Sequence, residues 1–179
     1  MRPAPRLSPR PLVVTALLAA ILLLAQISLS FLPNIELVTL LLLCYTAVFP
    51  LRQVLGAVLV FDLLEGILYG FGLWWIMYLY VWPIWVLLSL ALRRTSSGLV
   101  RAVAAGGYGL CFGALCALPY LAFGPGAALA NWVSGIPFDI AHCAGNFLTT
   151  LLLYTPLVKG LSLLQRQGQL PAANRDKKP

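Results

Sequence analysis

The chain has 179 residues, of which 61% are hydrophobic and only 9% are charged, and its mean hydropathy is +0.92. This composition differs strongly from that of water-soluble domains and indicates an all-α integral membrane protein. The net charge of +7 is poor evidence for nucleic-acid binding, because the basic residues fit a membrane topology and contact with anionic lipid.

Six apolar segments predict a bundle of six transmembrane helices over residues 12–161. The predicted spans are Leu12–Phe31, Ile35–Phe49, Val54–Tyr69, Leu73–Leu92, Leu99–Ala122 and Phe138–Leu157. Four of them approach the ~20 residues that a helix needs to cross a bilayer, whereas the second and third are short. Pro83 and Pro119 lie inside predicted helices and indicate kinks. Residues 1–11 and 162–179 are expected to be basic cytoplasmic tails.

The positions of the basic residues predict the orientation. With both termini in the cytoplasm, all 12 Lys and Arg residues fall on the inner side, in agreement with the positive-inside rule. They are Arg2, Arg6, Arg10, Arg52, Arg93, Arg94, Arg101, Lys159, Arg166, Arg175, Lys177 and Lys178. We therefore expect a multi-pass protein of a bacterial plasma membrane. A basic leader, an apolar run and the small residues Ser28 and Ser30 also fit a cleaved signal peptide, which would leave the later helices in the same orientation.

Acidic and aromatic residues gather at the opposite, outer end of the predicted bundle. The carboxylates there are Glu36, Asp62, Glu65 and Asp139. Asp62 and Glu65 are three residues apart and share a helix face. An aromatic stripe follows the next helix, with Trp74, Tyr78, Trp82 and Trp85. Together they predict an outward-facing pocket for a small, flat ligand that is either cationic or rich in hydrogen-bond donors, contacted by Asp62, Glu65, Trp74 and Tyr78.

A polar stripe marks the last apolar segment. A helix that begins at Pro137 would place Asp139, His142 and Asn146 on one face, at spacings of three and four residues. An ionisable group at membrane depth costs about 2.5–3.5 kcal/mol on insertion scales, so it usually faces the protein interior and has a function. We predict that this stripe forms one wall of the outward-facing pocket.

Simpler explanations remain open for these residues. Aromatic side chains near a helix end fit an interfacial belt, as for Trp74, Trp75 and Tyr80. The Asp62 and Glu65 pair fits bonds to neighbouring helices or to backbone at a helix end. His142 fits a pair with Asp139 that orients the imidazole ring, and Asn146 fits bonding between helices.

Two motifs carry a resemblance to a known family. Ala16 and Ala20 lie one turn apart on the first helix, a small-residue spacing that lets another helix approach closely. Residues 135–147 read Gly-Ile-Pro-Phe-Asp-x-x-His-x-x-x-Asn-Phe, and Leu-Leu-Leu-Tyr-Thr-Pro-Leu follows at 151–157. With six short helices, these features resemble the S component of an energy-coupling factor (ECF) transporter, over roughly Leu12 to Leu161.

The resemblance implies a partner assembly. Members of this family bind a vitamin or related micronutrient in a pocket that opens outward, and a transmembrane coupling subunit with two ATPase subunits drives uptake. Ala16 and Ala20 would then dock on the coupling subunit. Ligand contacts vary with the substrate in this family, so the resemblance assigns neither the vitamin nor the roles of the pocket residues.

Other classes of function are weighed against this one. The sequence holds no phosphate-binding Gly-x-x-x-x-Gly-Lys-Ser/Thr loop, so any ATP hydrolysis belongs to partners. We expect neither an enzyme nor a bound metal or cofactor, because no nucleophile and base or His pair stand together and the four cysteines lack ligand spacing. A rod-shape-determining membrane protein and a stand-alone ion-coupled transporter, with Asp62 or Glu65 as the ion site, remain alternatives.

Overall fold

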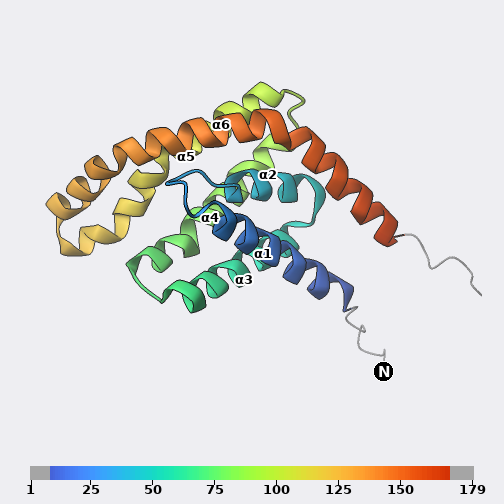
Figure 1. Cartoon of the computed structure of the whole chain (residues 1–179), viewed down its shortest axis with the longest axis horizontal. Coiled ribbons are helices and arrows are strands. Elements are labelled where there is room, and N and C mark those ends of the chain that lie inside the picture. The colour runs from blue at the N-terminus through green and yellow to red at the C-terminus, as the bar shows by residue number, and fades with distance from the viewer. Residues whose placement is uncertain (1–8, 170–179) are drawn as a thin grey trace, which may run out of the picture.

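The computed structural model describes residues 9–169, with side chains for residues 9–166, and every regular element in this range is helical (Figure 1). The α-helices are α1 (Arg10–Leu29), α2 (Val38–Val48), α3 (Leu51–Tyr69), α4 (Leu73–Leu92), α5 (Gly98–Ala117) and α6 (Pro125–Gln169). A 3-10 helix, η1 (Leu118–Phe123), joins α5 to α6. The predicted all-α class is confirmed for this part of the chain.

Four of the helices are long and apolar enough to cross a membrane. They are Arg10–Leu29, Leu73–Leu92, Gly98–Phe123 and Pro125–Arg166. Helix α2 has 11 residues, which gives about 16 Å of length against a hydrocarbon core of about 30 Å. Helix α3 carries Arg52, Asp62 and Glu65. The structure is therefore consistent with a membrane protein, while the number of six spans stays a prediction.

Local sequence explains several helix ends. Phe49 adopts extended backbone and ends α2, because the proline that follows it, Pro50, disfavours helical conformation in the residue before it. The hydroxyl of Ser97 accepts a hydrogen bond from the Val100 N–H at 3.2 Å and caps α5. Pro83 lies inside α4, which continues past it, whereas Pro119 falls where α5 gives way to η1.

The last helix differs most from the sequence-based expectation. Helix α6 runs for 45 residues from Pro125, so the predicted span Phe138–Leu157 is only its middle part. A helix start at Pro137, with a loop before it, is wrong. Pro125 instead takes the first position of α6, where a missing N–H costs nothing. A proline in the interior of a membrane helix is tolerated where neighbouring groups satisfy the freed carbonyl.

The packing places α2 at the centre of the bundle. Every residue of α2 from Val38 to Thr46 is buried, and the helix packs against α4 and α6. Helix α1 lies along α3, and α5 lies along α6 (Figure 1). Large apolar side chains fill a core around α2, and others cover the outer surface, for example Phe31 at 74% and Phe123 at 71% exposed. Such a surface suits lipid contact and is unusual on a soluble protein.

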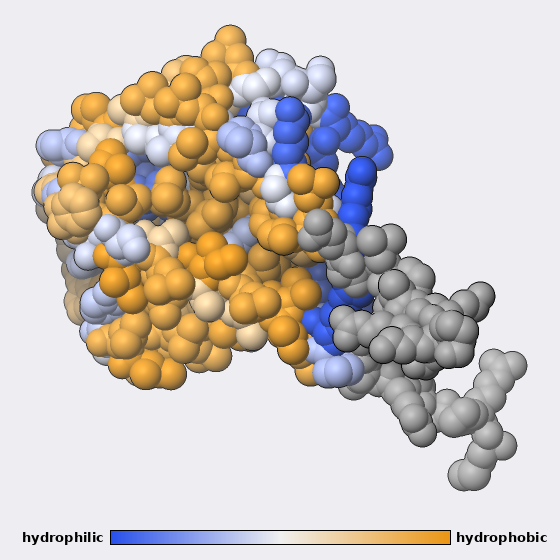
Figure 2. Space-filling model, turned by 45° about the vertical axis from the view of Figure 1, so that its right-hand side comes forward, coloured by the Kyte–Doolittle hydropathy of each residue, from blue (hydrophilic) through white to orange (hydrophobic). Residues whose placement is uncertain are grey.

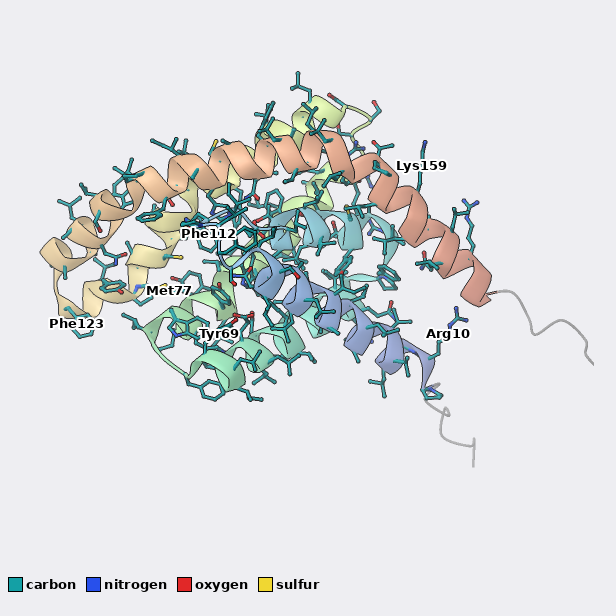
Figure 3. The ribbon with its side chains drawn as sticks, in the orientation of Figure 1. Arg10, Tyr69, Met77, Phe112, Phe123 and Lys159 are labelled. Atoms are coloured by element: carbon teal, nitrogen blue, oxygen red, sulfur yellow. The ribbon has the colours of Figure 1, made fainter. Side chains whose placement is uncertain are left out.

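The two ends of the bundle differ in character. Arg10 and Lys159 lie at one end, whereas Tyr69, Met77 and Phe123 lie toward the other (Figure 3). Figure 2 shows an apolar surface over most of one face, with hydrophilic residues gathered at one side of it. The start of α1 and the end of α6 thus lie at the same end of the molecule. This arrangement is needed if both helix ends are to face the same side of a membrane.

Candidate functional site

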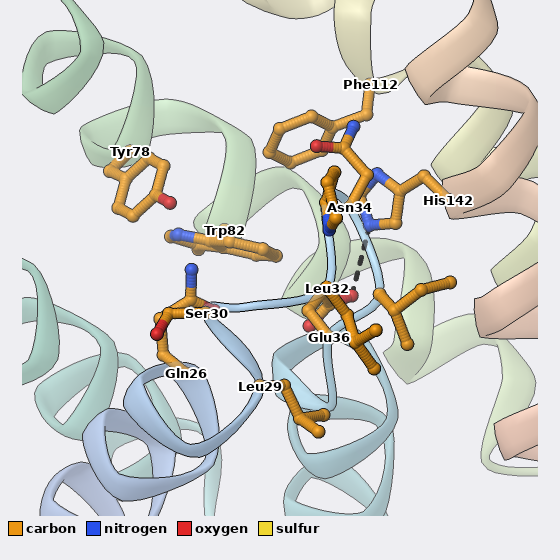
Figure 4. Close-up of a pocket in the computed structure, with 12 residues that line it drawn as sticks. Gln26, Leu29, Ser30, Leu32, Asn34, Glu36, Tyr78, Trp82, Phe112 and His142 are labelled. Atoms are coloured by element: carbon orange, nitrogen blue, oxygen red, sulfur yellow. Dashed lines mark hydrogen bonds and ion pairs between the residues drawn. The ribbon is translucent and has the colours of Figure 1, made fainter.

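A cavity of about 310 Å³ lies where the α1–α2 connection meets α4, α5 and α6 (Figure 4). Its volume is at the lower end of the range for small-molecule sites. The lining residues come from four helices and the connection: Gln26, Leu29, Ser30, Leu32, Pro33, Asn34, Ile35, Glu36, Tyr78, Trp82, Phe112 and His142. Amide, hydroxyl, carboxylate and imidazole groups thus converge on one space bounded by three aromatic rings.

The Glu36 carboxylate and the His142 imidazole form a buried hydrogen-bonded pair at the centre of this site. His142 donates from Nε2 to Oε1 of Glu36 at 3.1 Å, and both side chains are nearly fully buried. The other carboxylate oxygen of Glu36 accepts the Thr39 N–H at 2.9 Å, in the first turn of α2. The helix N-terminus favours this negative charge. No other ion pair occurs within the described residues.

The structure replaces one sequence-based explanation of His142. The ring is oriented by Glu36, 106 residues away in sequence, and not by Asp139 in the preceding turn. Oδ1 of Asp139 instead accepts the N–H of Gly113 at 2.9 Å. A Cβ on Gly113 would overlap the Asp139 carboxylate, so glycine at this position permits the contact between α5 and α6. Asp139 is buried but does not line the cavity.

The connection between α1 and α2 forms one side of the cavity and is anchored on α6. Asn34 has a φ of 56°, a left-handed conformation that asparagine tolerates better than most residues. Ile35 follows and fits beside Gly145, where an added Cβ would come within 2.8 Å of the isoleucine Cδ1. Glu36 then reaches His142. Two successive side chains therefore hold the connection against α6.

An uninterrupted series of aromatic rings runs from the N-terminal end of α4 into the cavity. Trp74 meets Tyr78 edge-on at 5.4 Å between centroids, and Tyr78 meets Trp82 at the same distance. Trp82 then contacts Phe112 at 5.4 Å, and Phe112 meets the His142 ring at 4.8 Å. Only Tyr78, of the two predicted aromatic contacts, lines the cavity, whereas Trp74 packs behind it.

The other aromatic residues named from the sequence bond to neighbouring helices. Trp85 donates to the Thr39 carbonyl at 2.8 Å and stacks on Tyr108. Trp75 donates to the Asp62 carbonyl at 2.7 Å, and Tyr80 donates to the Leu115 carbonyl at 2.7 Å. Trp75 and Tyr80 therefore have specific interhelical partners in addition to any role in an interfacial belt. These contacts fix α4 against α2, α3 and α5 and so position Tyr78 and Trp82.

The acidic pair on α3 is buried and does not line the cavity. Asp62 is 1% exposed and Glu65 is 3% exposed. Oδ1 of Asp62 and Oε1 of Glu65 have no hydrogen-bond partner among the described residues. The predicted sharing of one buried α3 face is confirmed, while direct ligand contact stays a prediction.

The polar stripe of α6 extends below the cavity. Asp139, His142 and Asn146 are all at most 3% exposed, so their predicted placement on the inner face is confirmed. Thr150 continues the stripe. His142 alone lines the cavity. The Asn146 amide has no partner for either polar atom within residues 9–166, so the expected bonding between helices is not observed for this residue.

The small-residue motif of α1 lies on the other side of that helix from the bundle core. Ala19 is fully buried, whereas Ala16 is exposed and Ala20 is half-buried. Thr15 approaches Gly56 of α3, so the adjacent face of α1 is the one that packs within this chain. The Ala16 and Ala20 face remains accessible to a partner helix.

Several lining residues were missed by reasoning from the sequence. Gln26, Ser30, Asn34 and Phe112 were not considered as ligand contacts, and Glu36 was noted only as an outer acidic residue. The polar Pro-Asn-x-Glu sequence at 33–36, between two apolar helices, is a signal that could have identified this connection. No group of three or more His, Cys, Asp or Glu side chains suited to a metal ion occurs in the described residues.

The arrangement is suited to reversible, non-covalent binding of a small molecule. Rings of Tyr78, Trp82 and Phe112 offer faces and edges for stacking. The indole N–H of Trp82 and Nδ1 of His142 are buried and have no partner within the described residues, so they are available to a ligand. Comparison with protein-family models, curated proteins and solved structures finds no match to this chain.

Proposed function

We propose that this chain is the substrate-binding membrane subunit, or S component, of an ECF-type importer in a bacterial plasma membrane. In this role it captures a vitamin or related micronutrient from outside. It then delivers the ligand through a transmembrane coupling subunit that two separate ATPase subunits drive. The cavity bounded by the Glu36–His142 pair and the aromatic rings carries this proposal.

The physical argument concerns the free-energy cost of burying polar side chains. Polar side chains inside a membrane bundle are unfavourable unless they are paired or serve a ligand. The cavity gathers several such groups at one place: the Glu36–His142 pair, the Gln26 amide and the Asn34 amide. A purely structural role, such as that of a rod-shape-determining protein, does not require them to converge on an empty volume. Ligand binding does require it.

The remaining features agree with a subunit that depends on partners. The sequence has no nucleotide-binding loop, so energy from ATP would come from other chains. The accessible Ala16 and half-buried Ala20 offer a small-residue face on α1 to a transmembrane partner. We assign this face to the coupling subunit.

The first experiment is to purify the full chain in lipid nanodiscs and to identify released small molecules by native mass spectrometry. We expect one small organic molecule to co-purify, and we expect His142→Ala to lose it, because the imidazole lines the cavity. Ile67→Ala, at a residue 69% exposed toward lipid, is the matched control and should retain it. Loss of the molecule from neither variant, or its absence from the wild-type protein, would contradict the proposal.

One observation favours a second candidate, a stand-alone ion-coupled transporter. The buried Asp62 and Glu65 carboxylates resemble the proton or sodium sites that such transporters require. Reconstitution of the chain alone in proteoliposomes separates the two functions. Uptake driven by a proton or sodium gradient without ATPase subunits would favour the transporter, whereas uptake only with a coupling module and ATP would favour the S component.

A further inference from the structure

Two side chains that line the cavity each carry a buried nitrogen atom without a partner in the described residues. They are Nε1 of Trp82 and Nδ1 of His142, and these side chains are 1% and 3% exposed. A buried hydrogen-bonding group without a partner is costly, and in native structures such groups bond to protein, ordered water or a ligand. The cavity is the space that both side chains border, so its occupant is the partner for which the structure has room.

Neighbouring side chains hold both rings in place. The Trp82 indole packs against three other aromatic rings, those of Phe61, Tyr78 and Phe112. The His142 imidazole is held by its hydrogen bond to Glu36 at 3.1 Å and by its edge-on contact with Phe112 at 4.8 Å between centroids. Neither ring can therefore turn its nitrogen toward another partner without breaking these contacts. Polar groups that are fixed in this way are preorganised for a ligand.

The two nitrogens require opposite groups on a ligand. The indole N–H of Trp82 is a donor only, so it requires an acceptor. The hydrogen of the His142 ring is on Nε2, because Nε2 donates to the Glu36 carboxylate, whose other oxygen accepts the Thr39 N–H. Nδ1 of the neutral ring is then an acceptor and requires a donor. A second proton on Nδ1 would create a buried cationic N–H without an acceptor, which is the more costly arrangement.

The Phe112 ring joins the two nitrogen-bearing rings. Its centroid lies 5.4 Å from that of Trp82 and 4.8 Å from that of His142, and the three rings come from α4, α5 and α6 (Figure 4). A ligand that bonds to both nitrogens therefore extends from α4 to α6 along Phe112, which offers it a stacking surface. The cavity volume of about 310 Å³ suits a molecule of one or two rings.

We propose, on the basis of the function proposed above, that the ligand is a heteroaromatic molecule with a hydrogen-bond acceptor at one end and an N–H donor at the other. The acceptor, a carbonyl oxygen or a ring nitrogen, bonds to the indole N–H of Trp82. The donor bonds to Nδ1 of His142, and the ring between them packs on Phe112. Recognition then depends on two directional hydrogen bonds that a ligand of the same shape without these groups leaves unmade.

The test compares two probes that differ in one donor group. The probe 4-quinolone carries a carbonyl oxygen and an N–H at opposite ends of one ring, and N-methyl-4-quinolone keeps the carbonyl but lacks the N–H. Binding to the full chain in nanodiscs, after removal of any co-purified molecule, is measured by isothermal titration calorimetry. We expect 4-quinolone to bind at least about tenfold more tightly than its N-methyl derivative. Equal affinities, or no detectable binding of 4-quinolone, would overturn the proposal.

Two substitutions assign the donor and the acceptor contact separately. His142→Gln keeps an N–H for Glu36 but removes the acceptor at Nδ1, so the preference for 4-quinolone should disappear, while retained affinity for N-methyl-4-quinolone shows that the variant is folded. Trp82→Phe keeps an aromatic ring but removes the N–H, so both probes should bind about tenfold more weakly and the preference should remain. Trp132→Phe, the same change at a residue 43% exposed and outside the lining, should alter neither affinity. A preference that survives in His142→Gln, or unchanged affinities in Trp82→Phe, would contradict the assigned contacts.

The failure of this inference is distinguishable from the failure of the proposed function. A co-purified molecule that His142→Ala loses, but that lacks either the ring acceptor or the N–H donor, would leave the S-component proposal in place and overturn the ligand class. If no small molecule co-purifies and neither probe binds, both proposals fail together.

Discussion

At the scale of single residues, the Glu36–His142 pair is the group on which the site depends most. It joins the α1–α2 connection to α6, which is distant in sequence, and both side chains are nearly fully shielded from water. A buried pair of this kind adds little net stability compared with an apolar pair, but breaking it by removing one partner is costly. The two residues therefore form an energetic unit.

A double-mutant cycle measures this coupling. His142→Ala leaves the Glu36 carboxylate buried with the Thr39 N–H as its partner, and we expect a loss of about 3–5 kcal/mol, as is typical of a broken buried pair. Adding Glu36→Gln to His142→Ala should recover part of that loss, because the second change removes the stranded charge. The measurement is unfolding in detergent, monitored by tryptophan fluorescence. Additive effects of the two changes would show that the pair is not coupled.

The burial of single residues could be predicted from the sequence, but their interaction partners could not. The stripe of Asp139, His142 and Asn146 was correctly assigned to an inner face, because three- and four-residue spacing follows directly from helix geometry. The partner of His142 was not predictable in the same way. Glu36 lies in a connection, whose path depends on how α1, α2 and α6 pack, and local spacing carries no information about such a contact.

At the scale of elements, boundaries were predictable where glycine or charge ends an apolar run. The predicted span Leu73–Leu92 agrees with α4, which lies between Gly72 and Arg93. The start of α6 was misplaced by 13 residues, from Pro125 to Phe138, because Pro137 was read as a helix start. The sequence alone does not distinguish Pro125 from Pro137 as the first residue of the helix. Packing against α5 and η1 decides that the helix continues through the second one.

The α1–α2 connection is the element whose position shapes the cavity, and Gly145 is its anchor. Gly145→Ala would place a Cβ within 2.8 Å of Ile35 Cδ1, so we expect the connection to move away from α6 while the helices stay folded. Gly160→Ala is the matched control on the same helix, since nothing lies within 4 Å of its added Cβ. Hydrogen–deuterium exchange should rise for residues 30–37 in Gly145→Ala alone. Unchanged exchange there would mean that Ile35 does not anchor the connection.

At the scale of the whole molecule, the separation of charged residues and the apolar exterior have the same physical cause. Lipid excludes charged groups, so they collect where water or a partner is available. The basic residues Arg10 and Lys159 lie at the same end of the molecule (Figure 3). Four carboxylates are buried in the bundle, and one of them, that of Glu36, lines the cavity. The sequence predicts this polarity of the molecule, because it depends on which residues the helix ends carry and not on how the helices pack.

Side-specific labelling tests the orientation that this polarity predicts. In a variant whose four cysteines are replaced, single cysteines are placed at Phe71, which is 62% exposed, and at Ser96, which is also exposed. The positive-inside rule places Ser96, between Arg94 and Arg101, in the cytoplasm. A membrane-impermeant maleimide should therefore label Phe71→Cys in intact cells and Ser96→Cys only after permeabilisation. The reverse pattern would invert the assigned topology and make the cavity open inward.

The separation between the cavity and the α1 face leads to the last prediction, that binding and delivery can be lost independently. Ala16→Trp fills the small-residue face, so we expect the purified chain to retain its ligand while cells lose uptake. His142→Ala should lose the ligand yet still co-purify with the coupling subunit. Leu17→Trp, a bulky change at a neighbouring position 58% exposed, controls for added volume on α1. If Ala16→Trp and Leu17→Trp support equal uptake, the Ala16 and Ala20 face does not dock a partner, because close helix approach is what small residues permit and tryptophan prevents.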